Sequence, residues 1–473
     1  MGGEALKAKI GVVGLAVMGQ NLVLNIEGKG HAVVAYNRTA DRTRALAERS
    51  RGRKVHPAYS LEGFVKALER PRAVLVMVKA GPAVDEVLEE LYPLLDEGDV
   101  VIDGGNSHFA DTERRLKAAE ERGLFYLGTG ISGGESGALH GPSIMVGGHR
   151  QGYEQVEALL ESIAARGPEG ACCGYLGPGS AGHYVKMIHN GIEYAIMETL
   201  AEAYDLMKRG LGMSPAEMAD TLADWNRGDL GSYLVEITER VLRETDPETG
   251  RPLVELIVDT AQQKGTGKWS SQSALDIGSP TPTIAASVFA RMISAIRAER
   301  IEAEKVLTGP APRLEGDRRA LLEEVQSAVY LTTVAAYAQG FRQLRDASRE
   351  RGYNLNLAEV ARVWMAGCII RAKLLAPIRD ALAAEAGLPL LLLAQPFLSD
   401  WNASNGALRH VVIEAHARGI PVPAMSSALD FVDAYRTGRL PANLTQAQRD
   451  YFGSHTYERL DRPGTFHTRW EAA

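Results

Sequence analysis

Residues 10–19 read IGVVGLAVMG, a short apolar run that passes directly into a glycine-spaced turn. The spacing Gly14-x-Ala16-x-x-Gly19 differs only at its second position from the Gly-x-Gly-x-x-Gly pattern of dinucleotide-binding folds. Gly14 can form the tight turn, and Gly19 can let the following helix approach the strand closely. Free amides and the partial positive charge at that helix N-terminus would suit a pyrophosphate. The stretch therefore predicts a strand, a turn and a helix that bind a dinucleotide; a tight turn without a ligand is the alternative.

The end of the second expected strand indicates which dinucleotide binds. Residues 36–39 read Tyr-Asn-Arg-Thr, and no acidic residue follows before Asp41. An acidic side chain at this place usually accepts hydrogen bonds from the ribose hydroxyls of NAD. Arg38 and Thr39 can instead bind a 2′-phosphate, Arg38 through its charge and its planar fork of donors. The residues favour NADP, and a solvated loop arginine is the alternative.

Strand and helix patterns divide the chain into three parts. Short apolar runs alternate with amphipathic stretches up to Ser180, which predicts a parallel sheet covered on both faces, in a Rossmann-type α/β domain at residues 1–180. Expected strands are residues 10–13, 32–36, 74–78, 100–102 and 124–127, and expected helices include residues 82–95 and 111–122. Residues 181–438 then predict a large all-α domain. Residues 439–473, with clustered aromatic side chains, predict a C-terminal tail that packs on another surface, for which a partner subunit is one candidate.

The bulk composition limits the classes of function. The 473 residues carry 52 Lys and Arg against 59 Asp and Glu, a net charge of −7 that argues against nucleic-acid binding. Cys172, Cys173 and Cys368 cannot pair fully, so we expect reduced thiols in a cytoplasmic enzyme. The most apolar stretch, residues 388–398, is too short for a bilayer, so no membrane association is expected. No metal-ligand spacing occurs either, so we expect no metal site.

A polar stripe follows the expected domain boundary. Read as a helix, residues 182–194 place five polar side chains opposite an apolar face: Lys186, His189, Asn190, Glu193 and Tyr194. Lys186 and Glu193 would lie roughly 10 Å apart along one face, so a small substrate could meet a base at one end and an acid at the other. A solvated face of an amphipathic helix is the alternative. Gly191 costs about 1 kcal/mol relative to Ala inside a helix, which suggests that something approaches this helix closely.

Several segments resemble the β-hydroxyacid dehydrogenase superfamily. They are the turn at residues 14–19, DGGNS at 103–107, ISGGE at 131–135 and the lysine-bearing segment at 182–190. Narrower features resemble the decarboxylating 6-phosphogluconate dehydrogenase family. These are KMIHNGIEY at residues 186–194, QKGTGKW at 263–269, FAR at 289–291 and NLTQAQRDYFGSH at 443–455. The resemblance runs from residue 10 to about residue 470.

The resemblance implies a specific set of site residues. The implied cofactor contacts are Gly14, Leu15, Ala16, Val17, Met18, Gly19, Asn37, Arg38, Thr39, Val78, Lys79, Ala80 and Asn106. The implied substrate contacts within one chain are Asn106, Ser132, Gly133, Gly134, His189, Asn190, Tyr194, Lys264, Thr266 and Arg291. Arg449 and His455 would come from the tail of the partner subunit in a homodimer. Arg291 lies in the apolar run 284–296, and a buried arginine needs an anion, for which a substrate phosphate and Glu299 are both candidates.

The resemblance also implies a reaction. It is the oxidative decarboxylation of 6-phospho-D-gluconate to D-ribulose 5-phosphate and CO₂ with reduction of NADP to NADPH, a step of the pentose phosphate pathway and of gluconate utilisation. Lys186, kept neutral by desolvation and nearby cations, would take the proton of the hydroxyl on the third carbon. Glu193 would later give a proton to the first carbon. Two alternatives stay open: a β-hydroxyacid dehydrogenase that does not decarboxylate, and a catalytically silent NADP-binding protein.

Overall fold

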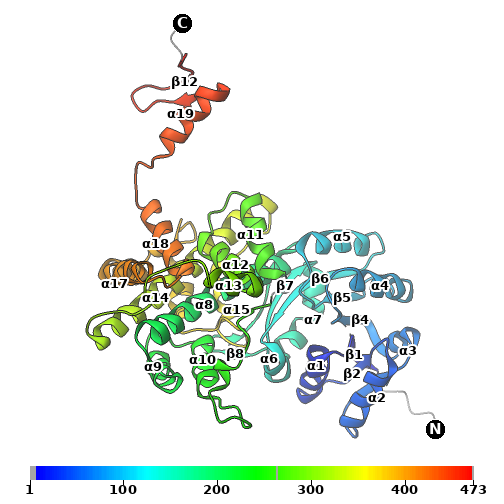
Figure 1. Ribbon diagram of the computed structural model, residues 1–473. Helices are drawn as coiled ribbons and strands as arrows, with labels where there is room; N and C mark the ends of the chain where they lie inside the picture. Colours follow the sequence, from blue (N-terminus) through cyan, green and yellow to red (C-terminus); the bar gives the residue numbers. More distant parts are fainter. Residues whose placement is uncertain (1–6, 263–264, 471–473) are drawn as a thin grey trace, which may run out of the picture.

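The first part of the chain is built around one sheet. The computed structural model describes residues 7–262 and 265–470. Eight strands form this sheet in the order β10-β7-β6-β5-β4-β1-β2-β3 (Figure 1). They are β1 (Ala8–Val13), β2 (Val33–Tyr36), β3 (Val55–Ala58), β4 (Leu68–Val76), β5 (Val100–Asp103), β6 (Phe125–Ser132), β7 (Ser143–Gly148) and β10 (Cys173–Gly177). The predicted Rossmann-type α/β fold is confirmed, but the expectation of a wholly parallel sheet is wrong at one place, because β6 and β7 are antiparallel.

Helices cover both faces of the sheet because its strands are apolar on both sides. Ile10 and Val12 of β1 pack into one core with α1 and α7, whereas Val74 and Val76 of β4 pack into another with α3, α4 and α5. The helices of this part are α1 (Val17–Gly28), α2 (Ala40–Arg49), α3 (Leu61–Lys66), α4 (Pro82–Leu91), α5 (Phe109–Glu120), α6 (Gly134–His140) and α7 (Arg150–Ile163). Open sheets of this kind bind ligands at the carboxyl edge of the strands, between the two helical layers.

The second part is helical and is organised around α8 (Ala181–Asp205), which begins directly after the last strand of the sheet. Most residues of α8 are buried, in one core with α14 (Arg318–Arg351) and its neighbours. The other helices are α9 (Pro215–Arg227), α10 (Tyr233–Arg243), α11 (Thr266–Asp276), α12 (Pro282–Ala295), α13 (Arg297–Glu304), α15 (Leu357–Trp364), α16 (Leu375–Ala384), α17 (Phe397–Ala417) and α18 (Pro423–Tyr435). In the part of the chain that the structure describes, none of the helices has the length and hydropathy needed to cross a bilayer.

Glycines bring α8 into close contact with the sheet and with α11. A side chain at Gly130 of β6 would collide with Lys186, and one at Gly182 of α8 would collide with the backbone of β6 and β7. A Cβ atom at Gly191 would lie 2.5 Å from the hydroxyl oxygen of Ser270 in α11. The close approach that Gly191 suggested is therefore made by a neighbouring helix. These contacts fix α8 as the wall between the sheet and the helical core.

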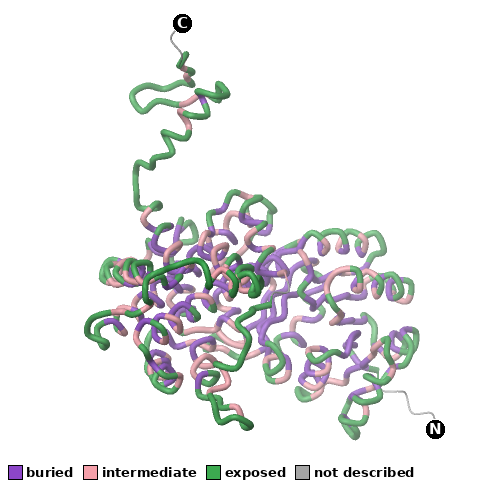
Figure 2. The backbone as a smooth tube through the Cα atoms, in the orientation of Figure 1, coloured by how far each residue is buried: buried purple, intermediate pink, exposed green. Residues whose placement is uncertain are grey.

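The C-terminal tail stands apart from the body of the chain. It consists of α19 (Ala442–Gly453) and a small hairpin of β11 (Tyr457–Glu458) and β12 (Thr465–Phe466). Figure 1 shows it projecting beyond α18, and Figure 2 shows that most of it is exposed, in contrast to the buried centre of the molecule. The tail is therefore folded locally but does not pack on the body of its own chain.

Candidate active site

The polar stripe of α8 lies in the interior, beside the end of β6. The amine of Lys186 donates a hydrogen bond to Oδ1 of Asn190 and lies 3.3 Å from Nδ1 of His189. The same Nδ1 lies 3.8 Å from a carboxylate oxygen of Glu193, and Nε2 of His189 lies 3.2 Å from the hydroxyl of Ser132. Because one imidazole contacts both Lys186 and Glu193, the amine and the carboxyl project to the same side of the helix.

Burial shifts the proton affinity of both groups toward their neutral forms. Desolvation lowers the pKa of Lys186, while the charges of Glu193 and Cys368 oppose this shift. Desolvation also raises the pKa of Glu193, against the opposing charges of Lys186 and Arg291. The expectation that nearby cations help to lower the pKa of Lys186 finds no support among the described residues. Burial therefore favours the uncharged amine and the protonated carboxyl, the forms that proton transfer between them and a substrate requires.

The imidazole between them stays neutral. Burial, and then the charge of Lys186, hold the pKa of His189 well below its usual value. A neutral ring has one donor and one acceptor nitrogen, so His189 can bond both Ser132 and the α8 stripe without adding charge. The alternative of a solvated helix face is excluded here, because Lys186 is only 6% exposed and His189 is fully buried.

Ser132, Gly133 and Gly134 form a narrow backbone turn at the end of β6. Gly133 and Gly134 have φ values of 129° and 62°, which favour glycine. A Cβ atom at Gly133 would lie 2.5 Å from the carbonyl oxygen of Gly367. Backbone amides are therefore the donors that this turn can offer to an anion.

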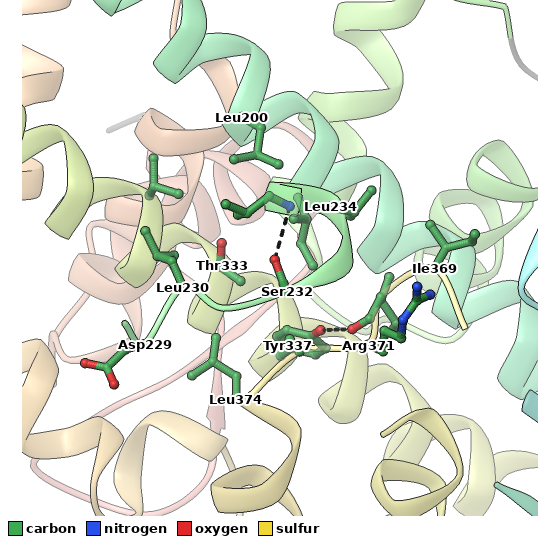
Figure 3. Close-up of a pocket in the computed structure, with 15 residues that line it drawn as sticks. Leu200, Asp229, Leu230, Ser232, Leu234, Thr333, Tyr337, Ile369, Arg371 and Leu374 are labelled. Carbon is green, nitrogen blue, oxygen red and sulfur yellow. Dashed lines mark hydrogen bonds between the residues drawn. The ribbon is translucent and has the colours of Figure 1, made fainter. Parts of the chain in front are cut away.

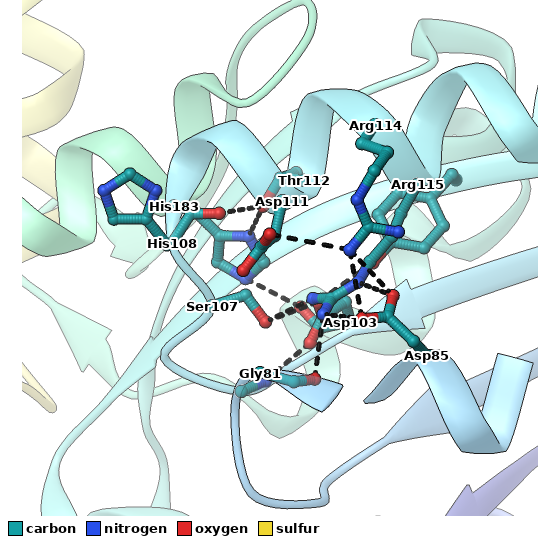
Figure 4. Close-up of polar contacts among 12 residues, drawn as sticks. Gly81, Asp85, Asp103, Ser107, His108, Asp111, Thr112, Arg114, Arg115 and His183 are labelled. Carbon is teal, nitrogen blue, oxygen red and sulfur yellow. Dashed lines mark hydrogen bonds and ion pairs between the residues drawn. The ribbon is translucent and has the colours of Figure 1, made fainter. Parts of the chain in front are cut away.

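Asn106 lies in the loop that follows β5, the strand next to β6 in the sheet. Hydrogen bonds to Asp103 hold this loop in place. Asp103, the last residue of β5, accepts hydrogen bonds from the hydroxyl of Ser107 at 2.7 Å and from the amide of Gly105 at 3.2 Å (Figure 4). The carbonyl of Asp103 lies 3.0 Å from Nε2 of His183 on α8. Asn106 itself is exposed at this edge. The loop is thus tied to the helix that carries Lys186.

Arg115 of α5 completes this support and was missed by the sequence analysis. Its guanidinium is 1% exposed and contacts Asp103 at 3.4 Å and Asp85 of α4 at 2.8 Å. The hydrogen bond from Arg115 lowers the pKa of Asp85 to about 2. Arg115 also donates to the carbonyl of Gly81 at 2.9 Å, so it joins the loops after β4 and β5 (Figure 4). Nothing in the sequence distinguishes it from the other arginines on amphipathic helices.

Tyr194, Thr266 and Arg291 form a third wall, made by α8, α11 and α12. The guanidinium of Arg291 lies 3.4 Å from the centre of the Tyr194 ring. A Cβ atom at Gly267 would lie 2.5 Å from that ring, so α11 places Thr266 close beside it. Arg291 is half-buried, which corrects the expectation of a buried arginine, because Tyr194 covers only one face of its guanidinium. Among the described residues, no ion pair joins Arg291 to Glu299, the alternative partner.

Two predicted substrate residues are not brought to this site by their own chain. Arg449 and His455 are exposed on the tail, beyond α18 (Figure 1). Lys264 lies outside the described residues.

The predicted cofactor turn lies beside a cleft of about 350 Å³ at the carboxyl edge of the sheet. Gly14 has a φ of 100°, and a Cβ atom there would lie 2.7 Å from the carbonyl oxygen of Met77. Gly19 packs directly against the carbonyl of Gly14. Oδ1 of Asn37 accepts a hydrogen bond of 2.9 Å from the amide of Leu15, so the end of β2 holds the turn in place. Both glycines therefore have the structural roles that their spacing predicted.

The cleft contains most of the predicted cofactor residues, together with residues that were not predicted. Its predicted lining residues are Gly14, Ala16, Asn37, Arg38, Thr39, Val78 and Lys79. Leu15, Val17, Met18, Gly19, Ala80 and Asn106 are not part of the lining. The sequence analysis missed Arg42 of α2 and Glu86 of α4, which also line the cleft. Glu86 forms an ion pair of 3.0 Å with Arg38, and both side chains are largely exposed. Arg42 was detectable in principle, because it lies one helical turn after Arg38.

A second, enclosed cavity lies in the helical part. It measures about 20 Å³, which is space for roughly one water molecule. Leu200, Leu230 and Leu234 line it, and the hydroxyl of Ser232 at its edge accepts a hydrogen bond from the amide of Val235 (Figure 3). None of the predicted site residues lines this cavity, so it is a packing defect of the core and not the site of chemistry.

Comparisons with known proteins cover almost the whole chain. The NAD binding domain of 6-phosphogluconate dehydrogenase matches residues 9–177, and the 6-phosphogluconate dehydrogenase C-terminal domain matches residues 182–470. The decarboxylating 6-phosphogluconate dehydrogenase of Synechococcus elongatus is 53% identical over 98% of this chain and 99% of its own length. The NADP(+)-dependent decarboxylating enzyme of Bacillus subtilis is 50% identical over the same shares. The solved 6-phosphogluconate dehydrogenase of Plasmodium falciparum, studied in apo form and in complex with its cofactor NADP+ and its substrate 6-phosphogluconate, has a TM-score of 0.93 and 41% identity over 98% of this chain and 100% of that chain.

Proposed function

The chain belongs to the 6-phosphogluconate dehydrogenase family, and on that premise we propose that it converts 6-phospho-D-gluconate and NADP to D-ribulose 5-phosphate, CO₂ and NADPH. One observation carries the proposal at the level of chemistry. Lys186 and Glu193 lie on one side of a buried helix, and burial drives the amine and the carboxyl toward their neutral forms. These are the protonation states of a general base and a general acid.

Lys186 is the base of the oxidation. Its neutral amine takes the proton of the hydroxyl on the third carbon while that carbon is oxidised to a ketone. Asn190 accepts a hydrogen bond from the amine and so directs it. The protonated amine then donates to the ketone oxygen and stabilises negative charge there as the carboxylate leaves as CO₂. Glu193, at the other end of the stripe, delivers a proton to the first carbon of the resulting enediol.

The residues at the carboxyl edge of the sheet fit NADP. NADP, when bound, supplies the hydride acceptor. Arg38, Thr39 and Arg42 offer two cations and a hydroxyl for the 2′-phosphate, and none of the residues that directly follow β2 is acidic before Asp41. The turn from Gly14 to Gly19 opens α1 with free amides for the pyrophosphate. Asn106 is exposed at the end of β5, in the loop that the carbonyl of Asp103 ties to His183 of α8, where it can contact cofactor and substrate.

The substrate site is completed by a second copy of the chain. Arg449 and His455 lie on the tail, and the tail projects away from the α8 stripe of its own chain (Figure 1). Apolar side chains on α12 and just after α13 are exposed, among them Phe289 at 63% and Leu307 at 73%. A homodimer covers this apolar face and brings each tail to the site of its partner. Buried free thiols at Cys172, Cys173 and Cys368 support a cytoplasmic location.

An absorbance assay with 6-phosphogluconate tests the reaction. NADP and NAD are supplied in parallel, and released CO₂ is measured against NADPH formed. We expect one CO₂ for each NADPH and faster turnover with NADP. A ratio near zero would support the non-decarboxylating alternative, and absence of NADPH would support the silent one.

A further inference from the structure

The exposed C-terminal tail has a buried polar centre of its own, Asp450. This carboxylate has no exposed surface, although the tail around it is thin. Oδ1 accepts hydrogen bonds from the amide of Thr456 at 2.9 Å and from Nδ1 of His467 at 2.9 Å. Oδ2 accepts from the amide of Thr468 at 3.0 Å and from the indole of Trp470 at 2.9 Å. These four donors come from the loop after α19 and from the segment after the hairpin, so one side chain ties three pieces of the tail together.

The loop that Asp450 holds is conformationally unfavourable. Ser454 and Thr456 have φ values of 49° and 60°, a region that residues other than glycine rarely adopt. The amide of Ser454 donates to the backbone carbonyl of Asp450, and the amide of Thr456 donates to its side chain. Backbone conformations of this kind persist only where surrounding contacts enforce them, and they occur preferentially at functional positions. His455 lies between the two residues.

Arg449 is fixed in the same arrangement. It precedes Asp450 on α19, and its guanidinium donates to Oε1 of Gln446 at 3.1 Å. Nε2 of Gln446 donates in turn to the carbonyl of Thr456 at 2.6 Å. One glutamine therefore connects the side chain of Arg449 to the backbone beside His455. Both basic residues are held in a fixed relation while their charged groups remain exposed.

We propose that Asp450 is a positioning residue, which pre-forms Arg449 and His455 as one anion-binding unit before the tail reaches the partner's site. This inference rests on the proposed function, in which the tail binds the substrate in trans. Among the described residues of the tail only Asp450 is buried, so there is no packed core to hold two side chains in register. A buried carboxylate with four donors can do so, because each bond to a charged acceptor is stronger than a neutral one. Pre-forming the pair removes part of the ordering cost from substrate binding.

The test begins with the homodimeric variant Asp450→Asn. The side-chain NH2 group of asparagine would face the N–H donors of Thr468 and Trp470, so these two hydrogen bonds would be lost. The loop after α19 and the end of the tail would then no longer be held together. We expect the KM for 6-phosphogluconate to rise about tenfold, the cost of ordering two flexible side chains on binding. The values of kcat and of KM for NADP should stay near those of the parent enzyme. An unchanged KM for 6-phosphogluconate would overturn the proposal.

Gln446→Ala provides an independent variant, because it removes the bridge from Arg449 to Thr456 and leaves the Asp450 contacts in place. We expect a smaller rise of the same KM, again without loss of kcat. Asp461→Asn is the matched control, since Asp461 is an exposed carboxylate of the same tail bonded to Arg459. It should leave both KM values unchanged, and an effect as large as that of Asp450→Asn would overturn the proposal.

Mixed dimers separate this inference from the proposed function. Asp450→Asn chains paired with Lys186→Ala chains have one working site, which receives an intact tail. We expect that site to regain the parent KM, whereas a KM that stays raised would place the defect in the body of the Asp450→Asn chain. Arg449→Ala paired with Lys186→Ala tests the premise in the same way. If that pair recovers no activity, the tail does not act in trans and the proposed dimeric site fails.

Discussion

At the scale of single residues, Lys186 can serve as a base only because the fold removes water from it. Its pKa is lowered by burial and raised again by the negative charge of Glu193, so the two groups titrate as a pair. The oxidation requires the neutral amine, and its rate therefore falls as pH drops below the pKa of Lys186. The protonation of the product requires the neutral carboxyl, and its rate falls as pH rises above the raised pKa of Glu193. We therefore expect the pH–rate profile to fall on both sides of its maximum.

Glu193→Gln tests this coupling. The substitution removes the charge that raises the pKa of Lys186, so the acidic limb of the first-turnover NADPH burst should move to lower pH. Release of the ketopentose phosphate should slow by about 10²–10⁴-fold, the usual contribution of a general acid. Stopped-flow absorbance across a pH series, with product measured after quenching, reports both effects. An acidic limb that stays in place, or product formed at the parent rate, would contradict the assignment of Glu193.

Arg38 is the residue proposed to select NADP over NAD. Arg38→Ala should weaken NADP binding by roughly tenfold to a hundredfold, the range for one hydrogen bond to a charged group, and leave NAD binding unchanged. Glu86→Gln frees Arg38 from its ion pair and should strengthen NADP binding slightly, more at low salt than at high salt. Fluorescence titration of the two cofactors measures these effects. Equal losses for NADP and NAD in Arg38→Ala would show that Arg38 does not contact the 2′-phosphate.

At the scale of elements, helix α8 could be predicted from the sequence, but the elements that pack around it could not. The spacing of Lys186 and Glu193 predicted one helix face, because helical periodicity is local. Gly191 indicated that another group packs closely against α8. The sequence could not identify this group as Ser270 of α11, because the contact joins residues far apart in the chain. β3 was not predicted, because a proline such as Pro57 is unusual inside a strand. It is tolerated in β3 because this strand lies at the edge of the sheet, where a missing amide does not break a hydrogen-bonded ladder. β7 ends in two glycines and joins β6 in the antiparallel sense, which strand-helix alternation cannot reveal.

The contact between α8 and α11 yields a stability prediction. In Gly191→Ala, the new methyl group would meet Ser270, so we expect the free energy of unfolding to fall by about 1–3 kcal/mol, as for other overpacked positions. KM for the substrate should rise as well, because α11 carries Thr266. Gly406→Ala in α17 is the matched control, since nothing lies within 4 Å of its Cβ position, and it should stabilise by about 0.5–1 kcal/mol. Urea unfolding compares the two, and similar effects would show that helix propensity alone governs Gly191.

At the scale of the whole molecule, the proposed site is divided between the body of the chain and its tail. The cofactor cleft, the α8 stripe and the Ser132 turn all belong to a single body, whereas the tail with Arg449 and His455 leaves it (Figure 1). The sequence predicted this separation from a change in composition, with proline and aromatic residues after the last long helix. It could not predict that the tail would be folded by one buried carboxylate, because the donors to Asp450 come from residues that no periodic pattern connects.

The consequence for the assembled enzyme is that activity and dimer formation should be lost together. Ile293 of α12 is 57% exposed, and Ile293→Glu would place a charge within the apolar face assigned to the dimer. We expect sedimentation to show a monomer, with turnover of 6-phosphogluconate at least about tenfold lower at limiting substrate, since the partner's two basic groups are missing. NADP binding should persist, because its cleft lies within one chain. Val241→Glu, at a 47% exposed position on α10 outside that face, should remain dimeric and active. A monomeric Ile293→Glu variant with the parent KM would show that the tail is not needed in trans.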